Sequence, residues 1–160
     1  MNNFVVADSE KCIGCRTCEI ACVLAHSKDG SLSKLSAKTF CPRLKVVKAA
    51  TLTTPVQCRH CENAPCVAAC PKQALVQNDH SVQVVKGACV GCKACLAACP
   101  YGAIEIVIAG NSTPRRVEVI KCDLCRDRED GPACIKTCPT NALHKVYNLS
   151  FDRRINQRKR

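Results

Sequence analysis

The sequence contains few aromatic residues: no tryptophan, two tyrosines and three phenylalanines among 160 residues. Its length suits one compact domain or two small ones fused, but so few large apolar side chains make a poor core by themselves. No run of about 18 apolar residues is present, so we expect no membrane-spanning helix. The sequence also lacks a Gly-rich phosphate loop, a Rossmann fingerprint and a Ser/His/Asp constellation, which argues against a catalytic site in this chain.

Cysteine, in contrast, is abundant, with 17 residues in the chain. This content needs a chemical reason, and disulfides, zinc and iron–sulfur clusters are the alternatives. The odd count disfavours a disulfide framework, and residues 1–8 have neither the basic nor the apolar region of an export signal. We therefore expect a cytoplasmic protein whose cysteines bind metal.

Sixteen of the cysteines form four blocks, and each block closes with Cys-x3-Cys. The blocks are Cys12, Cys15, Cys18 and Cys22; Cys58, Cys61, Cys66 and Cys70; Cys89, Cys92, Cys95 and Cys99; and Cys122, Cys125, Cys134 and Cys138. The spacer before the closing Cys-x3-Cys is two residues in the first and third blocks, four in the second and eight in the fourth. A proline follows the last cysteine of every block except the first.

The pattern Cys-x2-Cys-x2-Cys-x3-Cys-Pro is typical of bacterial ferredoxins. Three of its thiolates bind one [4Fe–4S] cluster, and the fourth ligates the other cluster of a pair. Structural zinc sites usually combine two separated Cys-x2-Cys pairs instead. The spacing therefore predicts four [4Fe–4S] clusters on the sixteen block cysteines, with zinc as the disfavoured alternative. Because metal binding is coupled to folding in such a chain, we expect the iron-free protein to be largely unfolded.

The formal net charge of +11 would ordinarily suggest a nucleic-acid partner. A [4Fe–4S]2+ core bound by four thiolates carries about −2, so four clusters bring the total to roughly +11 − 8 = +3. We interpret much of the basic excess as compensation for anionic cofactors. No nucleic-acid partner is therefore expected.

Between the blocks, the sequence predicts short strands. They are expected at 4–6, 44–47, 75–76, 82–85, 103–108, 117–120 and 142–146. Turn residues at 78–79 and 110–111 join the two inner pairs into hairpins. The first and last strands are expected to pair with each other and close an outer unit.

Short helices are predicted over 17–25 and 132–137, with Pro65 and Pro132 near the first turns of helices. Residues 27–57 form a Ser- and Lys-rich insertion between the first two blocks. The C-terminal tail is strongly basic, with Ser150 placed as a helix N-cap. This tail is either a solvated, frayed terminus or a helix that docks a partner.

Several residues outside the ligand set have predicted roles. Cys41 is expected to be a small buried side chain, and His60 to lie beside the ligands or at the surface. Three glycines are expected to form turns whose amides approach cluster sulfurs: Gly14, Gly91 and Gly102. Four cations beside ligands either tune the clusters or are solvated, with at least half expected to be solvated: Arg16, Arg59, Lys93 and Lys121.

Residues 12–22 (CIGCRTCEIAC), 61–66 (CENAPC), 122–125 (CDLC) and 130–134 (DGPAC) carry a family resemblance. The chain resembles the four-cluster electron-transfer subunits of the HycB/HydN type, which accompany formate dehydrogenases and hydrogenases, over about residues 2–147. The resemblance implies an α+β fold of two nested 2[4Fe–4S] ferredoxin-like units. Its parts are 1–26 with 115–149 as the outer unit, 27–57 as an insertion, 58–114 as the inner unit and 150–160 as a tail.

The family pattern also implies how the ligands are shared. In the outer unit, one cluster takes Cys12, Cys15, Cys18 and Cys138, and the other takes Cys122, Cys125, Cys134 and Cys22. In the inner unit, one cluster takes Cys58, Cys61, Cys66 and Cys99, and the other takes Cys89, Cys92, Cys95 and Cys70. All sixteen positions are present in this chain.

The function implied is that of a non-catalytic subunit. It would relay electrons between a formate dehydrogenase or CO2 reductase and a hydrogenase, as in formate hydrogenlyase and hydrogen-dependent CO2 reductase. The implied partners are a catalytic formate dehydrogenase-type subunit, a hydrogenase subunit and a second polyferredoxin, in a soluble assembly. Two alternatives remain: a free polyferredoxin shuttle or maturation accessory, and a relay that also acts as an assembly scaffold through its tail.

Overall fold

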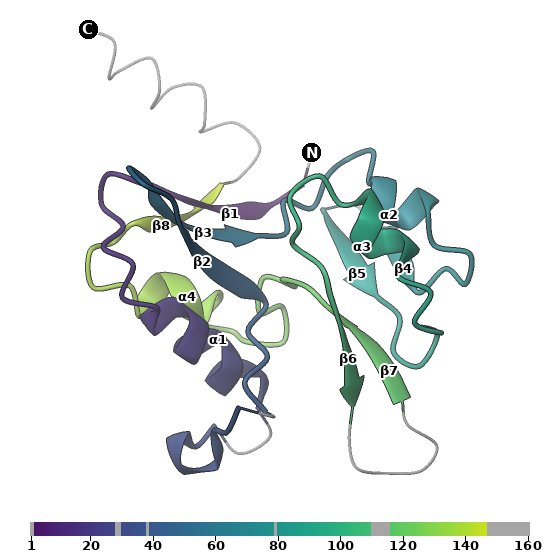
Figure 1. Ribbon diagram of the computed structural model, residues 1–160, viewed down its shortest axis with the longest axis horizontal. Helices are drawn as coiled ribbons and strands as arrows, with labels where there is room; N and C mark the ends of the chain where they lie inside the picture. The colour runs from purple at the N-terminus through teal and green to yellow at the C-terminus, as the bar shows by residue number, and fades with distance from the viewer. Residues whose placement is uncertain (1, 28–29, 38, 79, 110–115, 147–160) are drawn as a thin grey trace, which may run out of the picture.

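The computed structural model describes residues 2–27, 30–37, 39–78, 80–109 and 116–146. In these ranges the chain is α+β, as predicted, and its elements lie in two neighbouring groups (Figure 1). In chain order they are β1 (Phe4–Ala7), α1 (Thr17–His26), the 3-10 turn η1 (Leu32–Lys34), β2 (Leu44–Lys48), β3 (Thr53–Gln57), α2 (Pro65–Ala68), β4 (Leu75–Asn78), β5 (Ser81–Val84), α3 (Ala94–Ala98), β6 (Glu105–Ala109), β7 (Arg116–Ile120), α4 (Ala133–Lys136) and β8 (Leu143–Val146). Among these described helices, none has the length and apolarity needed to cross a membrane.

The strands pair into two-stranded antiparallel sheets. The first strand, β1, pairs with the last, β8, with Val5 opposite Lys145, so the predicted closure by the two ends of the chain is confirmed. The predicted hairpins are present as β4–β5 and β6–β7. The pairing of β1 with β8 brings the first cysteine block next to the fourth, although the first ends at Cys22 and the fourth begins only at Cys122.

Buried side chains form two cores, one in each group of elements (Figure 1). The first core contains Val5, Cys18, Cys22, Leu44, Val46, Cys134 and Leu143. The second contains Ala64, Cys66, Leu75, Val82, Cys95, Ile104 and Val119. The first core thus takes its cysteines from blocks one and four, and the second from blocks two and three.

The predicted insertion supplies a hairpin, β2–β3, of which only β2 was expected. Pro55 lies within β3, where it is tolerated because a strand of a two-stranded sheet has a free edge. Leu44 and Val46 of β2 belong to the first core, and the Val46 amide donates a 2.6 Å hydrogen bond to the buried Glu19 carboxylate of α1. This part of the insertion is therefore an integral part of the first core.

Helix lengths follow the proline pattern of the blocks. The helices α2, α3 and α4 have four or five residues, and each ends before a Cys-Pro step that disfavours further helix. Cys22 is followed by Val23, so α1 continues to His26 and has ten residues. Pro65 begins α2 and Pro132 is the N-cap of α4, as predicted for the first turns of helices.

Polar side chains buried between the two groups connect them. Lys121 is only 2% exposed, and its ammonium donates hydrogen bonds to the carbonyl oxygens of Val82 (2.6 Å) and Cys122 (2.8 Å). His60 is fully buried, and its Nδ1 accepts a hydrogen bond of 3.1 Å from the Val82 amide. The Asn2 side chain donates to the His60 carbonyl oxygen. Backbone carbonyls from both groups thus satisfy a buried cation at their junction.

The predicted C-terminal helix and its N-cap, Ser150, lie outside the described residues, as does the turn at 110–111. The predictions about the tail therefore remain predictions.

Candidate metal centres

Three of the four blocks end in the same turn. The third residue after the last cysteine has a positive φ, at Gln73 (48°), Gly102 (58°) and Asn141 (51°). The next residue is an alanine whose amide donates a hydrogen bond to the cysteine Sγ: Ala74 to Cys70 at 3.2 Å, Ala103 to Cys99 at 3.5 Å and Ala142 to Cys138 at 3.3 Å. Amide donors of this kind stabilise negative charge on sulfur.

The tight loops of blocks one and three share a second geometry. Gly14 and Gly91 have φ of 69° and 76°, and the second residue after each glycine, Arg16 or Lys93, has φ of 61° or 64°. The Gly91 amide donates to Cys89 Sγ at 3.4 Å, as predicted. The prediction is also confirmed for Gly102, because its turn directs the amide of the following Ala103 at Cys99 Sγ. Both loops leave their middle cysteine exposed.

The first predicted ligand set is brought together in the group of elements that contains α1 and α4. Cys12, Cys15, Cys18 and Cys138 line one small cavity. Burial raises the pKa of the Cys18 thiol to about 11, whereas a hydrogen bond from the Thr17 hydroxyl lowers the pKa of the exposed Cys15. The set therefore contains both a deeply placed thiol and one at the surface.

The second set lies deeper in the same group, where α1 packs against α4. Burial is the largest cause that raises the pKa of Cys134, and the neighbouring thiols of Cys122, Cys22 and Cys125 raise it further. Burial also raises the pKa of Cys122 to about 12. Thiols in this environment stay protonated until a metal compensates the charge of the thiolate, so metal binding here releases protons.

The third and fourth sets lie in the other group of elements. Burial raises the pKa of Cys66 to about 11, with further contributions from Cys58 and Cys99. Burial raises the pKa of Cys95, and the charges of Cys70 and Cys89 raise it further. The two remaining members belong to the same loops: Cys61 is partly buried and Cys92 is exposed.

This donor set fits iron–sulfur clusters. The sites consist of thiols from four separate chain segments, and backbone amides approach six of the sulfurs: Cys22, Cys58, Cys70, Cys89, Cys99 and Cys138. Soft thiolate ligands with N–H donors to sulfur are the environment that such clusters use.

A network that the sequence did not reveal lies beside the second set. The Asp123 carboxylate accepts a hydrogen bond from His26 Nε2 at 3.0 Å and one from the Arg43 guanidinium. Burial lowers the pKa of His26, but its hydrogen bonds to Asp123 and Cys22 outweigh burial and raise it to about 10. The Arg43 amide donates to Cys22 Sγ at 3.3 Å, replacing the alanine amide of the other blocks. Asp123 therefore ties α1 and the insertion to block four.

The remaining predicted residues have varied positions. His60 is fully buried, so the surface alternative for it was wrong. Cys41 is only partly buried, in contrast to the expected buried side chain. Arg59 lies over the rings of Phe4 (5.4 Å to the centroid) and Tyr101 (6.0 Å). Of the four flanking cations, Lys121 is buried and Arg59 half-buried, and the other two are exposed.

Comparison with known proteins identifies the family. A model described as a 4Fe-4S dicluster domain matches residues 49–147. Electron transport protein HydN of Escherichia coli K12 is 45% identical over 168 residues, which cover 96% of this chain and 96% of HydN. The chain belongs to the HydN-type family of 4Fe–4S electron-transport proteins. Formate hydrogenlyase subunit 2 of E. coli K12 is 40% identical over 188 residues, covering 100% of this chain and 89% of that protein.

Membership of the HydN-type family confirms the predicted resemblance and makes this chain an iron–sulfur electron-transfer protein. Among solved structures, a chain of the active-site complex BamBC of benzoyl coenzyme A reductase with benzoyl-CoA is similar to this chain. The alignment covers 98% of this chain and 87% of that chain. It has 22% sequence identity and a TM-score of 0.47.

Proposed function

We propose that this chain binds four [4Fe–4S] clusters and relays electrons between a formate-oxidising or CO2-reducing subunit and a hydrogenase. The observation that supports the cluster number is that members of each proposed set lie near one another. Cys12, Cys15, Cys18 and Cys138 line one cavity. In the other three sets, Cys134, Cys66 and Cys95 each lie close to thiols of their own set. When bound, the clusters supply reversible one-electron chemistry. The two cores, each with cysteines from two blocks, support an arrangement of two nested ferredoxin-like units.

The exposure of the thiols supports a relay with an exchange site at each end. Cys15 and Cys92 are exposed, and they belong to different proposed ligand sets in different groups of elements. The other two sets contain no exposed cysteine. The chain thus offers two of the proposed sites to the surface and has two enclosed sites without an exposed ligand, and a through-protein relay requires sites of both kinds.

The cluster number is tested by counting iron and acid-labile sulfide in anaerobically purified protein. Roughly 16 iron atoms are expected per chain, four for each cluster. Replacing Cys92 with serine removes a ligand from one exposed set. If that cluster is lost, the iron count is expected to fall to roughly 12. If the cluster is kept in part, it is expected to become a three-iron form that is visible by EPR. Cys41→Ser is the matched control and should leave the count unchanged. About 8 iron atoms in the unaltered protein would reduce the number of clusters to two.

The relay is tested in the complex that co-purifies with the chain under anaerobic conditions. Removing this subunit should abolish coupled transfer from formate to protons, because no path joins the two catalytic subunits. Each half-reaction should continue with artificial dyes. The similarity to formate hydrogenlyase subunit 2 supports this choice of partners. Full coupled activity without the subunit would rule out the relay.

The second candidate is an electron shuttle without permanent partners, which is compatible with the similarity to electron transport protein HydN. Size-exclusion chromatography of a native anaerobic extract separates the two functions. Elution as a small monomer favours the shuttle, and elution with large catalytic subunits favours the relay.

A further inference from the structure

The loop that carries Cys12, Cys15 and Cys18 has an apolar side chain at its tip. Ile13 is 66% exposed, and the neighbouring Cys15 is exposed as well. An exposed isoleucine beside a cluster ligand gains nothing for folding, because its apolar surface remains in water. Its position over the proposed cluster site makes it a candidate contact for another protein.

Two cations lie against this loop. A Cβ atom built on Gly14 would meet Lys48 Cε at 2.9 Å and Lys48 Nζ at 3.5 Å, so the lysine side chain lies directly on the loop backbone. Arg16 follows Cys15 and is exposed. In the described part of the chain, no carboxylate forms an ion pair with Arg16 or Lys48. Both side chains are also exposed, so a partner at this loop can reach them.

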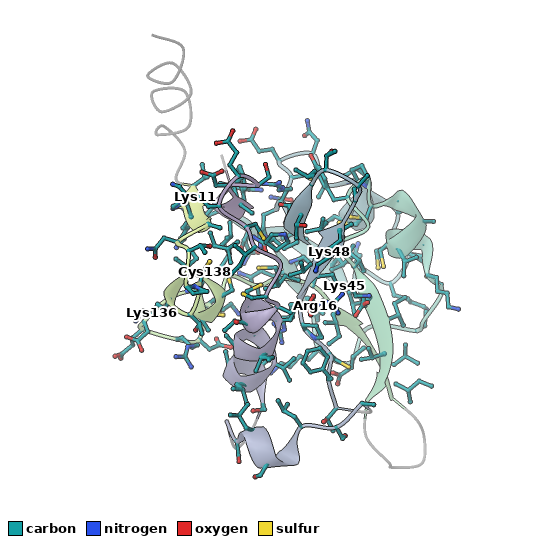
Figure 2. The ribbon with its side chains drawn as sticks, turned by 60° about the vertical axis from the view of Figure 1, so that its left-hand side comes forward. Lys11, Arg16, Lys45, Lys48, Lys136 and Cys138 are labelled. Carbon is teal, nitrogen blue, oxygen red and sulfur yellow. The ribbon has the colours of Figure 1, made fainter. Side chains whose placement is uncertain are left out.

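More cations surround this loop on the side of the molecule shown in Figure 2. Each of them is already paired with a carboxylate: Lys11 with Asp8 at 3.5 Å, Lys136 with Asp130 at 2.9 Å, and Lys45 with Glu105. Glu10 is a further exposed acid nearby in the sequence. Of these five cations, Arg16 and Lys48, next to Ile13, are thus the two without a carboxylate partner among the residues that the structure describes.

The corresponding loop of block three is different. Its tip is also apolar, with Val90 58% exposed, and Lys93 takes the place of Arg16. However, a Cβ atom on Gly91 would meet Val117 Cγ1 at 3.1 Å, so a valine occupies the position of Lys48. The two exposed cysteine loops therefore differ in chemistry. Of the two, only the Cys15 loop has a lysine side chain packed against its glycine.

We propose that the surface formed by Ile13, Arg16 and Lys48 docks an acidic redox protein, one that presents carboxylates around its own electron-exchange site. This inference rests on the proposed electron-transfer function and adds the chemistry of one partner. An apolar centre beside unpaired charges is the composition of transient docking sites, in which charge steers the encounter and apolar contact brings the two redox centres together. The Cys15 loop would then be the electron exit or entry.

The experiment measures electron transfer from the reduced protein to two acceptors of opposite charge. Oxidised plant plastocyanin is the acidic probe and oxidised mitochondrial cytochrome c is the basic one. In each reaction this chain loses one electron, and the copper or haem iron of the acceptor gains it. The variant is Arg16→Gln with Lys48→Gln. The matched control is Arg126→Gln with Arg128→Gln, which removes the same charge from exposed side chains of the block-four loop.

At low ionic strength, the Arg16/Lys48 variant is expected to slow the second-order reaction with plastocyanin about tenfold. The control pair should change it less than twofold, and added salt should remove the difference. Reaction of the same variant with cytochrome c should not slow. Equal slowing by both pairs, or equal slowing with both acceptors, would overturn the docking surface, because it would indicate total charge or an altered cluster.

The outcome also separates this inference from the function on which it rests. A reduced chain that transfers electrons to neither acceptor would contradict the proposed function itself. Transfer at rates that the Arg16/Lys48 variant does not change would contradict only the docking surface. If the double variant loses its clusters, Lys48→Gln alone is used against Arg128→Gln. Lys48 lies outside the cysteine blocks, and an approximately threefold selective loss is expected from one charge.

Discussion

Replacing Lys121 with methionine is expected to lower the potentials of the two enclosed clusters by about 60 mV, a tenfold change in the one-electron equilibrium. Lys121 is 2% exposed, and no carboxylate pairs with it in the described ranges. Burial raises the pKa of Cys58 and of Cys122, and the charge of Lys121 opposes this rise at both thiols. These two thiols belong to the two enclosed ligand sets, so one cation acts on both.

The magnitude follows from Coulomb's law. At a separation on the order of 12 Å and an effective dielectric constant of about 20, a unit charge contributes roughly 1.4 kcal/mol, which corresponds to about 60 mV for one electron. Reduction adds one electron to the site, so a nearby cation favours the reduced form and its loss disfavours it. The neighbouring His60 does not replace this charge. Its pKa is lowered to about 3 by burial and, to a smaller extent, by Lys121, and the burial, which is the larger cause, remains in the variant.

EPR-monitored redox titration of three variants distinguishes charge from packing. Lys121→Met removes the charge and the donor, Lys121→Gln keeps a donor, and Lys121→Arg keeps the charge. We expect the Met and Gln variants to shift the same two clusters and the Arg variant to resemble the original protein. Lys136→Met, at a side chain 54% exposed, is the surface control. Shifts of equal size in the Arg and Met variants would show that shape, not charge, is what matters at this position.

The sequence predicted the features that depend on local pattern. The Cys-x3-Cys stretches predicted α1 and α4, Pro65 indicated the first turn of α2, and strand-like runs around turn residues predicted β4–β5 and β6–β7. Even the long-range pairing of β1 with β8 was predictable, because these two strands were left without neighbours in the chain. The repeat Cys-Pro-x-x-Ala was visible in the sequence as well, although its role of aiming an amide at sulfur required coordinates.

What the sequence did not predict depends on contacts between distant segments. Asp123 meets His26 and Arg43 across 97 and 80 residues, and neither contact leaves a spacing signal. The strand β3 was missed because its sequence, two threonines followed by Pro55, Val56 and Gln57, shows no apolar alternation. Burial of His60 arises where the two groups of elements meet, which no local pattern indicates. One signal was available for His26, since it lies one helical turn after the ligand Cys22.

Iron removal is expected to have the second large effect, the loss of most tertiary structure. The ligand cysteines are members of both cores: Cys18, Cys22 and Cys134 in the first, Cys66 and Cys95 in the second. The largest fully buried side chains are Lys121, Leu75, His60, Val5 and Val82, and none of these is a large aromatic residue. Without metal, the apolar area that remains is small, and the buried thiols with raised pKa lose the compensation that clusters supply.

The measurement is a comparison of amide NMR spectra before and after anaerobic chelation of iron from a diamagnetic, oxidised sample. The amide resonances should collapse to the narrow range of an unfolded chain, and reconstitution with iron and sulfide should restore them. Cys41→Ser protein should behave identically, since Cys41 belongs to neither core. A well-dispersed spectrum of the iron-free protein would show that side-chain packing alone holds this fold. In that case the scarcity of aromatic residues would need another explanation than cofactors acting as core.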